Sequence, residues 1–234
     1  MKRIFIYCLI LCMTGVGLAS CNDDNDELTD SRLTYYPVLT LNGESFVQVP
    51  IGTAYKELGC KAVLNGEDYT SKVVTSGTVD PNKAGLYTIT YSATNADGFS
   101  KSTSRTVAVC DPSITTDMSG KYTVAEGTHR VASSGETPYS GFAITVRKDA
   151  PGIFYISDIL GGYYDQRAGY GASYAMTGYF QLMADNSVQI LSGDVAGWGD
   201  SYSDFTDGKY DPATNTISYV VTYAGMEFHV ILTL

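Results

Sequence analysis

Aromatic and polar side chains are concentrated in two segments of the sequence, and together they have the chemistry of a sugar-binding site. The first segment, residues 161–174, is rich in glycine and tyrosine, and the second spans residues 198–205. Flat aromatic faces stack on the C–H-rich faces of pyranose rings, while planar donors and acceptors bind hydroxyl groups. The candidate stacking residues are Tyr163, Tyr164, Tyr170, Trp198 and Tyr202, and the candidate hydrogen-bonding residues are Asp165, Gln166, Arg167 and Asp200.

A structural role is the alternative for the same side chains. Tyrosines of β-proteins commonly pack under their own loops or fill the inside of a barrel, and such residues bind nothing. The sequence leaves both interpretations of the two segments open, as a binding site or as packing.

Enzymatic chemistry finds little support. His129 and His229 are the only histidines of the sequence, and neither a GxSxG nor an HExxH motif occurs. A glycosidase needs two facing carboxylates, but no spacing among the aspartates of residues 158–207 selects a pair. Three aspartates of residues 200–207 offer oxygen ligands without the EF-hand pattern of a calcium site. We therefore expect no catalysis, no cofactor and no metal.

Composition favours an all-β protein that does not bind nucleic acid. The sequence has 24 glycines and 19 tyrosines, and no segment keeps an apolar period of 3.6 over three turns. Its formal net charge is −10, which repels phosphates, and no cluster of lysine or arginine overrides that charge. At 234 residues, the chain has room for two ordinary β-domains.

The sequence from residue 111 to residue 234 predicts an antiparallel meander. In its last strand, five apolar residues from Met226 to Leu234 alternate with mostly polar ones, so one face is buried. About eight such strands can close on themselves, so we expect an up-and-down, lipocalin-like β-barrel, with a β-sandwich as the alternative. The predicted strands are 121–125, 142–147, 153–159, 174–183, 188–192, 208–210, 217–223 and 226–234.

Residues 37–110 predict a smaller β-sandwich. Short β-rich runs alternate with turn signals, and the run Gly85-Leu86-Tyr87-Thr88-Ile89 has the spacing of a tyrosine corner. This stretch resembles a bacterial immunoglobulin-like domain of surface proteins, which implies a spacer or presentation module. Asp111-Pro112-Ser113 then breaks the last strand and marks the predicted domain boundary.

Two cysteines of this stretch form a candidate disulfide. On the immunoglobulin topology that the resemblance implies, Cys60 opens the second strand and Cys110 closes the last, and these ends lie at the same pole. A bond would add about 4 kcal/mol of stability in the chain-entropy model. Two buried thiols are the alternative, because neighbouring strand ends need not meet disulfide geometry.

The N-terminus predicts export and lipidation. Two basic residues, Lys2 and Arg3, precede an apolar run over residues 4–19, which is typical of a secretory signal peptide of residues 1–20. The run ends in Leu18-Ala19-Ser20-Cys21, which resembles the lipobox of bacterial lipoproteins. The resemblance implies a membrane anchor on Cys21.

Residues 21–36 are acidic and polar and predict a flexible tether. An acidic run behind the lipidated cysteine resembles the surface-export signal of Bacteroidetes lipoproteins, which implies the outer face of the outer membrane; a periplasmic linker is the alternative. The whole arrangement resembles a Bacteroidetes lipoprotein family that pairs an immunoglobulin-like domain with a β-rich C-terminal domain. That resemblance implies architecture and not activity.

These observations together predict a non-catalytic surface lipoprotein that binds a glycan or another extracellular ligand as an accessory to an outer-membrane nutrient importer. A structural or protein-interaction module of the cell envelope is the alternative, and a glycoside hydrolase is the third reading.

Overall fold

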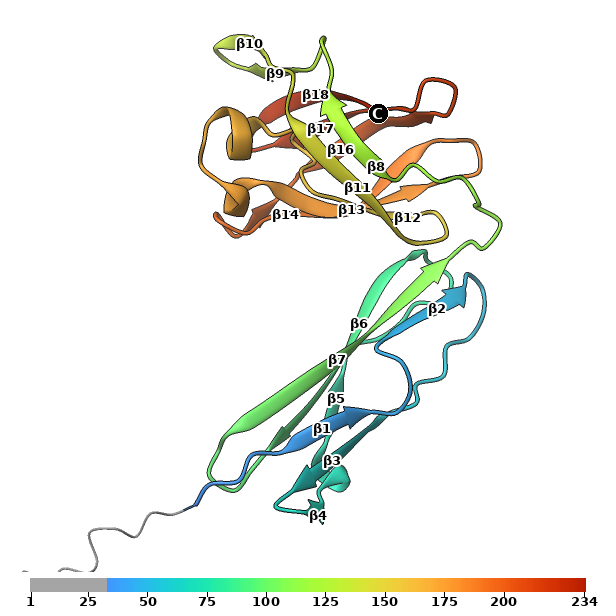
Figure 1. The fold of residues 1–234 in the computed structure, drawn as a ribbon, viewed down its shortest axis with the longest axis vertical. Coiled ribbons are helices and arrows are strands. Elements are labelled where there is room, and N and C mark those ends of the chain that lie inside the picture. Colours follow the sequence, from blue (N-terminus) through green and yellow to red (C-terminus); the bar gives the residue numbers. More distant parts are fainter. Residues whose placement is uncertain (1–32) are drawn as a thin grey trace, which may run out of the picture. The chain divides into compact units, whose positions relative to one another are not determined.

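The computed structural model describes residues 33–234. The predicted signal peptide of residues 1–20, the lipidation residue Cys21 and most of the predicted tether of residues 21–36 lie outside the described residues. Among the residues that are described, no helix is long and apolar enough to cross a membrane. Nearly all regular structure is β-strand, with a few short helical segments between strands (Figure 1). The predicted all-β class is confirmed.

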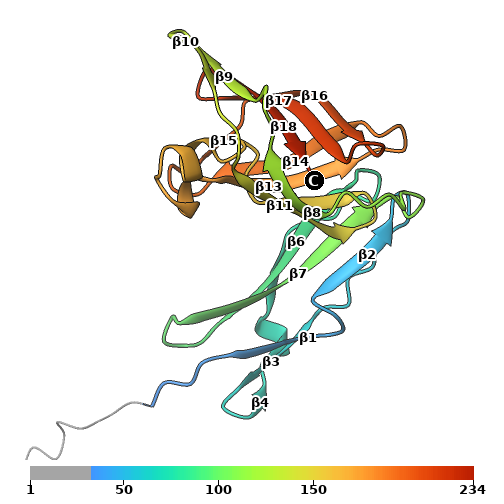
Figure 2. The same ribbon diagram turned by 45° about the horizontal axis from the view of Figure 1, so that its top comes forward.

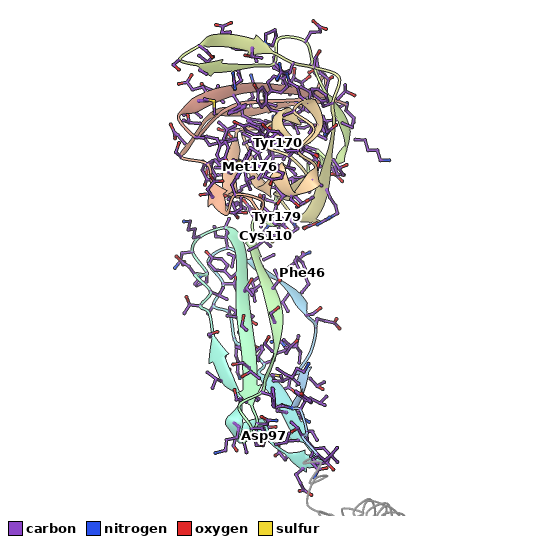
Figure 3. The ribbon with its side chains drawn as sticks, turned by 90° about the vertical axis from the view of Figure 1, so that its left-hand side faces the viewer. Phe46, Asp97, Cys110, Tyr170, Met176 and Tyr179 are labelled. Atoms are coloured by element: carbon purple, nitrogen blue, oxygen red, sulfur yellow. The ribbon has the colours of Figure 1, made fainter. Side chains whose placement is uncertain are left out.

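The first domain is the predicted immunoglobulin-like domain, with two small sheets. One sheet has the order β1-β3-β4 and the other β2-β7-β6-β5, in which β2 runs parallel to β7. In Figure 3, Asp97 and Cys110 mark the two ends of the long β6–β7 hairpin. The elements are β1 (Val38–Leu41), β2 (Phe46–Pro50), β3 (Cys60–Leu64), β4 (Glu67–Asp68), η1 (Thr70–Lys72), β5 (Val74–Ser76), β6 (Gly85–Thr94) and β7 (Ser100–Cys110).

The predicted tyrosine corner is present at the start of β6. The Tyr87 hydroxyl donates a 2.8 Å hydrogen bond to the backbone carbonyl of Lys83, four residues upstream. This bond ties β6 to the turn that precedes it and fixes the conformation of that turn. The spacing of a few residues was thus sufficient to predict a local tertiary contact.

A fully buried arginine in the middle of β7 joins three segments of the same domain. The Arg105 side chain donates hydrogen bonds to the backbone carbonyls of Asn42 (2.7 Å) and Glu44 (2.9 Å) and forms an ion pair with the Glu57 carboxylate. Gly59 donates a further backbone bond of 2.8 Å to Glu57. The buried charge is therefore matched on every side, as burial of an ion requires.

The two cysteines are free thiols, so the candidate disulfide does not form. Cys60 and Cys110 are both buried and unbonded to each other. Cys60 packs in a core cluster with Tyr91 and Val107, whereas Cys110 packs in a different cluster with Ala108. Because the thiols belong to separate clusters, the second alternative, two buried thiols, describes the structure.

The second domain is one antiparallel sheet of eleven strands. Consecutive strands pair from β11 to β15 and from β16 to β18, and β9 pairs with β10. β8 pairs with β11, and β18 pairs with β9 along its first half and with β8 at its end. The elements are β8 (Gly120–Val124), β9 (His129–Ala132), β10 (Gly135–Pro138), β11 (Ala143–Ala150), β12 (Ile153–Ile156), η2 (Tyr163–Arg167), η3 (Ala172–Tyr174), β13 (Met176–Leu182), β14 (Val188–Val195), β15 (Asp200–Ser201), β16 (Asp204–Asp211), β17 (Thr216–Tyr223) and β18 (Met226–Thr233).

This sheet wraps around one apolar core without closing into the barrel that was our first expectation. β14 and β16 form no hydrogen-bonded ladder, and the one isolated bridge at this edge joins Ser187, just before β14, to Lys209 of β16. The register of β16 shifts between Thr206 and Lys209, and Asp207 there has a φ of 54°, so the strand edge is interrupted where closure would occur. The β-sandwich alternative remains compatible with this sheet.

The β9–β10 hairpin was absent from the predicted strands. In Figure 2 it extends beyond the rest of the sheet. Its side chains are half-buried or exposed, and β10 contains Gly135 and Pro138, two residue types that strands disfavour. The sequence therefore lacked the alternation that indicated the other strands.

The predicted domain limits, 37–110 and 111–234, stay predictions; β7 ends at Cys110 and β8 begins at Gly120.

Candidate functional site

The glycine-rich segment between β12 and β13 forms a π-helical turn, η2. Gly161 and Gly162 enter it with φ values of 63° and 76°, which favour glycine, and a side chain on Gly162 would come within 2.9 Å of Phe142. The backbone N–H of Arg167 then bonds to the carbonyl of Gly162 at 2.8 Å.

A buried carboxyl group holds this turn in place. Both oxygens of Asp158 accept backbone N–H bonds, from Leu160 (2.8 Å) and Met176 (3.1 Å) on Oδ1 and from Gly162 (3.0 Å) on Oδ2. Burial raises the pKa of Asp158 to about 7, although the three N–H donors act to lower it. Asp158 thus ties the beginning and the end of the segment to one point.

Gln166 also has a structural role rather than the hydroxyl-binding role considered for it. Its side-chain amide accepts a bond from the backbone N–H of Ala143 (3.1 Å) and donates to the carbonyl of the same residue (2.9 Å). Through these two bonds the amide pairs with the backbone of Ala143 as a neighbouring strand would, and it fixes η2 to the beginning of β11.

A second loop, between β14 and β15, carries Trp198. The backbone N–H groups of Trp198 and Gly199 both bond to the carbonyl of Val195, at 3.1 and 2.8 Å, and close a tight turn. The N–H of Gly197 bonds to the carbonyl of Ser173 in the first loop at 2.7 Å. The two loops are therefore joined through their backbones, which positions their side chains together.

Three aromatic rings of these loops line a shallow hollow of about 480 Å³. They are Tyr170, Tyr174 and Trp198, and we call them the aromatic platform. The Tyr174 and Trp198 ring centres lie 4.8 Å apart, and Tyr170 lies 5.6 Å from Tyr174 and 6.1 Å from Trp198. Tyr170 is 57% exposed and Trp198 44% exposed. Figure 3 labels Tyr170 beside the short helical segments of this loop.

Deeper rings support the platform from below. Tyr164 contacts Trp198 edge-on at 4.9 Å, and Tyr223 of β17 stacks on Trp198 at 6.2 Å. The Tyr223 hydroxyl donates a 2.7 Å hydrogen bond to the Asp200 carboxylate. Burial raises the pKa of Tyr223, and the hydrogen bond to the Asp200 carboxylate raises it further. The phenol therefore stays neutral and continues to donate.

The structure brings most of the sequence-predicted residues together. Tyr164, Tyr170 and Trp198 join the platform or its support, and Asp200 accepts a hydrogen bond from the supporting Tyr223. Tyr163 is only 5% exposed and belongs to the core, with Arg167 stacked over its ring at 4.9 Å. The ligand-binding roles of all these residues stay predictions.

Two predicted residues do not line the hollow. Tyr202 packs against the domain core and makes no ring contact with Trp198 among the described residues. Asp165, on η2, is half-buried and forms no side-chain hydrogen bond within the described part of the chain.

Sequence reasoning missed several contributors to this site. Tyr174 stood in the aromatic segment but was assigned to a strand, and Tyr223 was one of many alternating strand residues. Arg130 lies on the unpredicted hairpin, and Asp158 was one acid among many. No group of three or more potential metal ligands occurs among the described residues.

The fold and this site define a class of protein: an immunoglobulin-like domain followed by a β-rich domain that carries an exposed aromatic hollow. Family models match both parts. The model for a bacterial surface protein, Ig-like domain, matches residues 39–109, and the model of a C-terminal domain matches residues 111–234. No curated protein matches the chain.

The particular family follows from a solved relative. The crystal structure of the lipoprotein BT2262 from Bacteroides thetaiotaomicron is 45% identical over 85% of this chain and 100% of that chain, with a TM-score of 0.49. The identity and coverage, rather than the superposition, carry this relationship. The chain belongs to the family of this lipoprotein.

Two further solved structures are similar at much lower levels. Both come from ZmpB of Clostridium perfringens. One contains the M60 catalytic domain with CBM51-1 and CBM51-2 (19% identity, 53% of this chain, 14% of that chain, TM-score 0.29). The other contains CBM51-2 in complex with GlcNAc and INT domains (20% identity, 51% and 28% coverage, TM-score 0.27). Likenesses at these TM-scores carry no argument about this chain.

Proposed function

We propose that this chain is a non-catalytic surface lipoprotein that binds a glycan through the aromatic platform. The observation that carries the proposal is the exposure of Tyr170 (57%) and Trp198 (44%) around a common hollow. Large aromatic side chains lose favourable burial when they face water, so a cluster of them at the surface is typical of a binding site.

The platform is also held rigid, which favours binding. Its two loops are joined by the Gly197–Ser173 backbone bond, and its lower side rests on the ring of Tyr164. A preformed site loses little conformational entropy when a ligand binds. The hydroxyl groups of the two tyrosines of the platform supply donors and acceptors for sugar hydroxyls.

Two of the carboxyl groups in this region form hydrogen bonds within the fold, which favours binding over hydrolysis. Asp158 accepts three backbone N–H bonds in the interior, and Asp200 accepts the Tyr223 hydroxyl. A glycosidase requires two carboxyl groups free to face the same glycosidic bond. These two acids are instead used to hold the loops.

The N-terminal sequence supplies the cellular setting of the proposal. Lipidation of Cys21 anchors the chain in the outer membrane, and the acidic tether of residues 21–36 carries both domains on its outer face. Kinship with a lipoprotein supports this arrangement. In that position the chain serves as an accessory to an outer-membrane importer, and it captures glycan for uptake.

Glycan-array binding with the purified full chain tests the proposal. The chain is compared with the double variant Y170A/W198A and with F99A, which removes an aromatic residue of the first domain that is 48% exposed. We expect binding that Y170A/W198A lowers at least tenfold and that F99A leaves unchanged. Absence of binding to every glycan would refute the proposal and favour a protein-docking surface, since Tyr and Trp are also typical of protein interfaces.

A further inference from the structure

Two arginines from distant parts of the sequence meet at one tyrosine ring next to the aromatic platform. Arg130 lies on β9 and Arg167 at the end of η2, and each guanidinium carbon lies 4.9 Å from the centre of the Tyr163 ring. That ring contacts Tyr164 at 5.0 Å, which in turn contacts Trp198 at 4.9 Å. A short series of touching rings thus links both positive charges to the platform.

Neither arginine has an acidic partner among the described residues. Arg130 makes one side-chain hydrogen bond, of 3.3 Å to the Thr137 hydroxyl, and its Nε is buried without any partner. The guanidinium group of Arg167 makes no hydrogen bond within the described part of the chain and is exposed. The ion pairs present there are Arg105 with Glu57, Arg147 with Asp149 and His229 with Glu227.

This arrangement has an electrostatic cost that a ligand would remove. Two guanidinium groups beside one ring repel each other, and an anion bound by their solvent-facing nitrogens would offset that repulsion. The chain has 25 acidic residues against 15 basic ones, so acids to neutralise the pair are plentiful in the sequence. Of the acids in these loops, Asp200 is bonded to Tyr223 and Asp165 makes no ion pair with either arginine.

The stacking geometry leaves the arginines able to bind an anion. A guanidinium group placed over an aromatic face is held by cation–π attraction, and the edge that faces solvent, which for Arg130 does not include the buried Nε, remains able to donate. That edge matches the two oxygens of a carboxylate and binds them in a bidentate manner, and it binds sulfate oxygens in a similar way.

We propose that the glycan held by the aromatic platform is acidic, and that Arg130 and Arg167 bind its carboxylate or sulfate group while a sugar ring stacks on Trp198. This inference rests on the proposed function and names its ligand class. A uronic acid supplies the carboxylate, and a sulfate ester supplies the same anionic oxygens.

The test compares polymers that differ only in charge. De-esterified polygalacturonate is compared with its fully methyl-esterified form, and dextran sulfate with dextran, by calorimetric titration of the purified full chain. We expect at least tenfold tighter binding of the charged member of one pair, and the pair concerned distinguishes a carboxylate from a sulfate. Raising the salt concentration should weaken this preference, because ions screen the attraction.

Variants connect the preference to the two arginines. R130Q/R167Q should remove it, and R167Q, at an exposed side chain that folding does not need, should lower it at least threefold. R147Q is the matched control, since Arg147 also stacks on a tyrosine, Tyr155 at 4.6 Å, but is paired with Asp149. We expect R147Q to bind like the unchanged chain.

The outcomes separate this inference from the proposed function. Equal binding of charged and neutral members in both pairs, lost in Y170A/W198A but kept in R130Q/R167Q, would overturn the acidic ligand and leave the glycan site standing. Absence of binding to every glycan, the result that refutes the proposed function, would overturn both.

Discussion

Arg105 of the first domain and the pair Arg130 and Arg167 of the second domain have opposite electrostatic surroundings. In the immunoglobulin-like domain, Arg105 is fully buried and is bonded to two backbone carbonyls and the Glu57 carboxylate. In the second domain, Arg130 and Arg167 stack on Tyr163 and have no acidic partner among the described residues.

This difference separates a charge that builds the fold from charges that are available to a ligand. A buried ion must be satisfied inside the protein, because its desolvation is otherwise too costly, and once satisfied it offers nothing to another molecule. The first domain contains such a matched network around Arg105. The second domain keeps both unpaired cations and exposed rings at one place.

The largest effect is expected from removing the matched arginine. R105A removes the cation paired with the Glu57 carboxylate and the side-chain donor to two backbone carbonyls, so it should lower the free energy of unfolding by about 3–5 kcal/mol. Urea denaturation measures this change. R147A, which breaks a largely exposed ion pair, should cost less than about 1 kcal/mol and serves as the control. Equal costs for the two variants would contradict the contrast between buried and exposed arginines.

A smaller effect is expected from pH, with opposite signs in the two domains. Burial alone would raise the pKa of Glu57. Hydrogen bonds from Tyr55 and Gly59 and the charge of Arg105 outweigh burial and hold that pKa at about 2. That depressed pKa gives stability above about pH 4.5 that is lost as the pH falls towards 2. The pKa of Asp158, raised to about 7, gives stability that is present below about pH 3.8 and is lost as the pH rises through 7.

Two isosteric variants check this pH dependence. E57Q should flatten the loss of stability on the acid side, and D158N should flatten the loss between about pH 4 and pH 7. One titrating group changes stability by at most about 1.4 kcal/mol per pH unit. Urea denaturation across this pH range measures both slopes, and a D158N variant with an unchanged slope would show that Asp158 titrates as it does in the unfolded chain.

The smallest effect on stability is expected at the platform. Trp198 is 44% exposed and its ring packs on Tyr174 and Tyr164, so W198A should lower the free energy of unfolding by less than about 1 kcal/mol. Thermal denaturation of the variant measures this cost. A loss of several kcal/mol would show that Trp198 serves packing, which is the structural alternative for these aromatics.

Features with a repeating or compositional pattern were predicted from the sequence, whereas features that depend on a single residue or contact were missed. Alternating apolar residues predicted β17 and β18 almost to their ends, and the tyrosine spacing predicted the bond from Tyr87 to Lys83. The density of aromatic residues predicted the region of the platform. These signals are periodic or compositional, and a single sequence shows them directly.

Three features had no such signal. The β9–β10 hairpin that carries Arg130 has polar, half-exposed strands, so its pattern resembles a loop. The role of Asp158 depends on backbone N–H groups up to 18 residues away, and nothing in the sequence distinguishes it from the other aspartates. The open edge between β14 and β16 depends on a local register shift, which a strand count cannot show.

The most direct test of the platform uses its own fluorescence, because Trp198 is the only tryptophan in the sequence. The full chain is titrated with a glycan that binds it on the array while the tryptophan emission is recorded. We predict a saturable change in Trp198 emission that follows the calorimetric binding curve and requires Tyr170, because the sugar ring covers the indole. Saturating calorimetric binding with unchanged emission would place the ligand elsewhere and contradict the account.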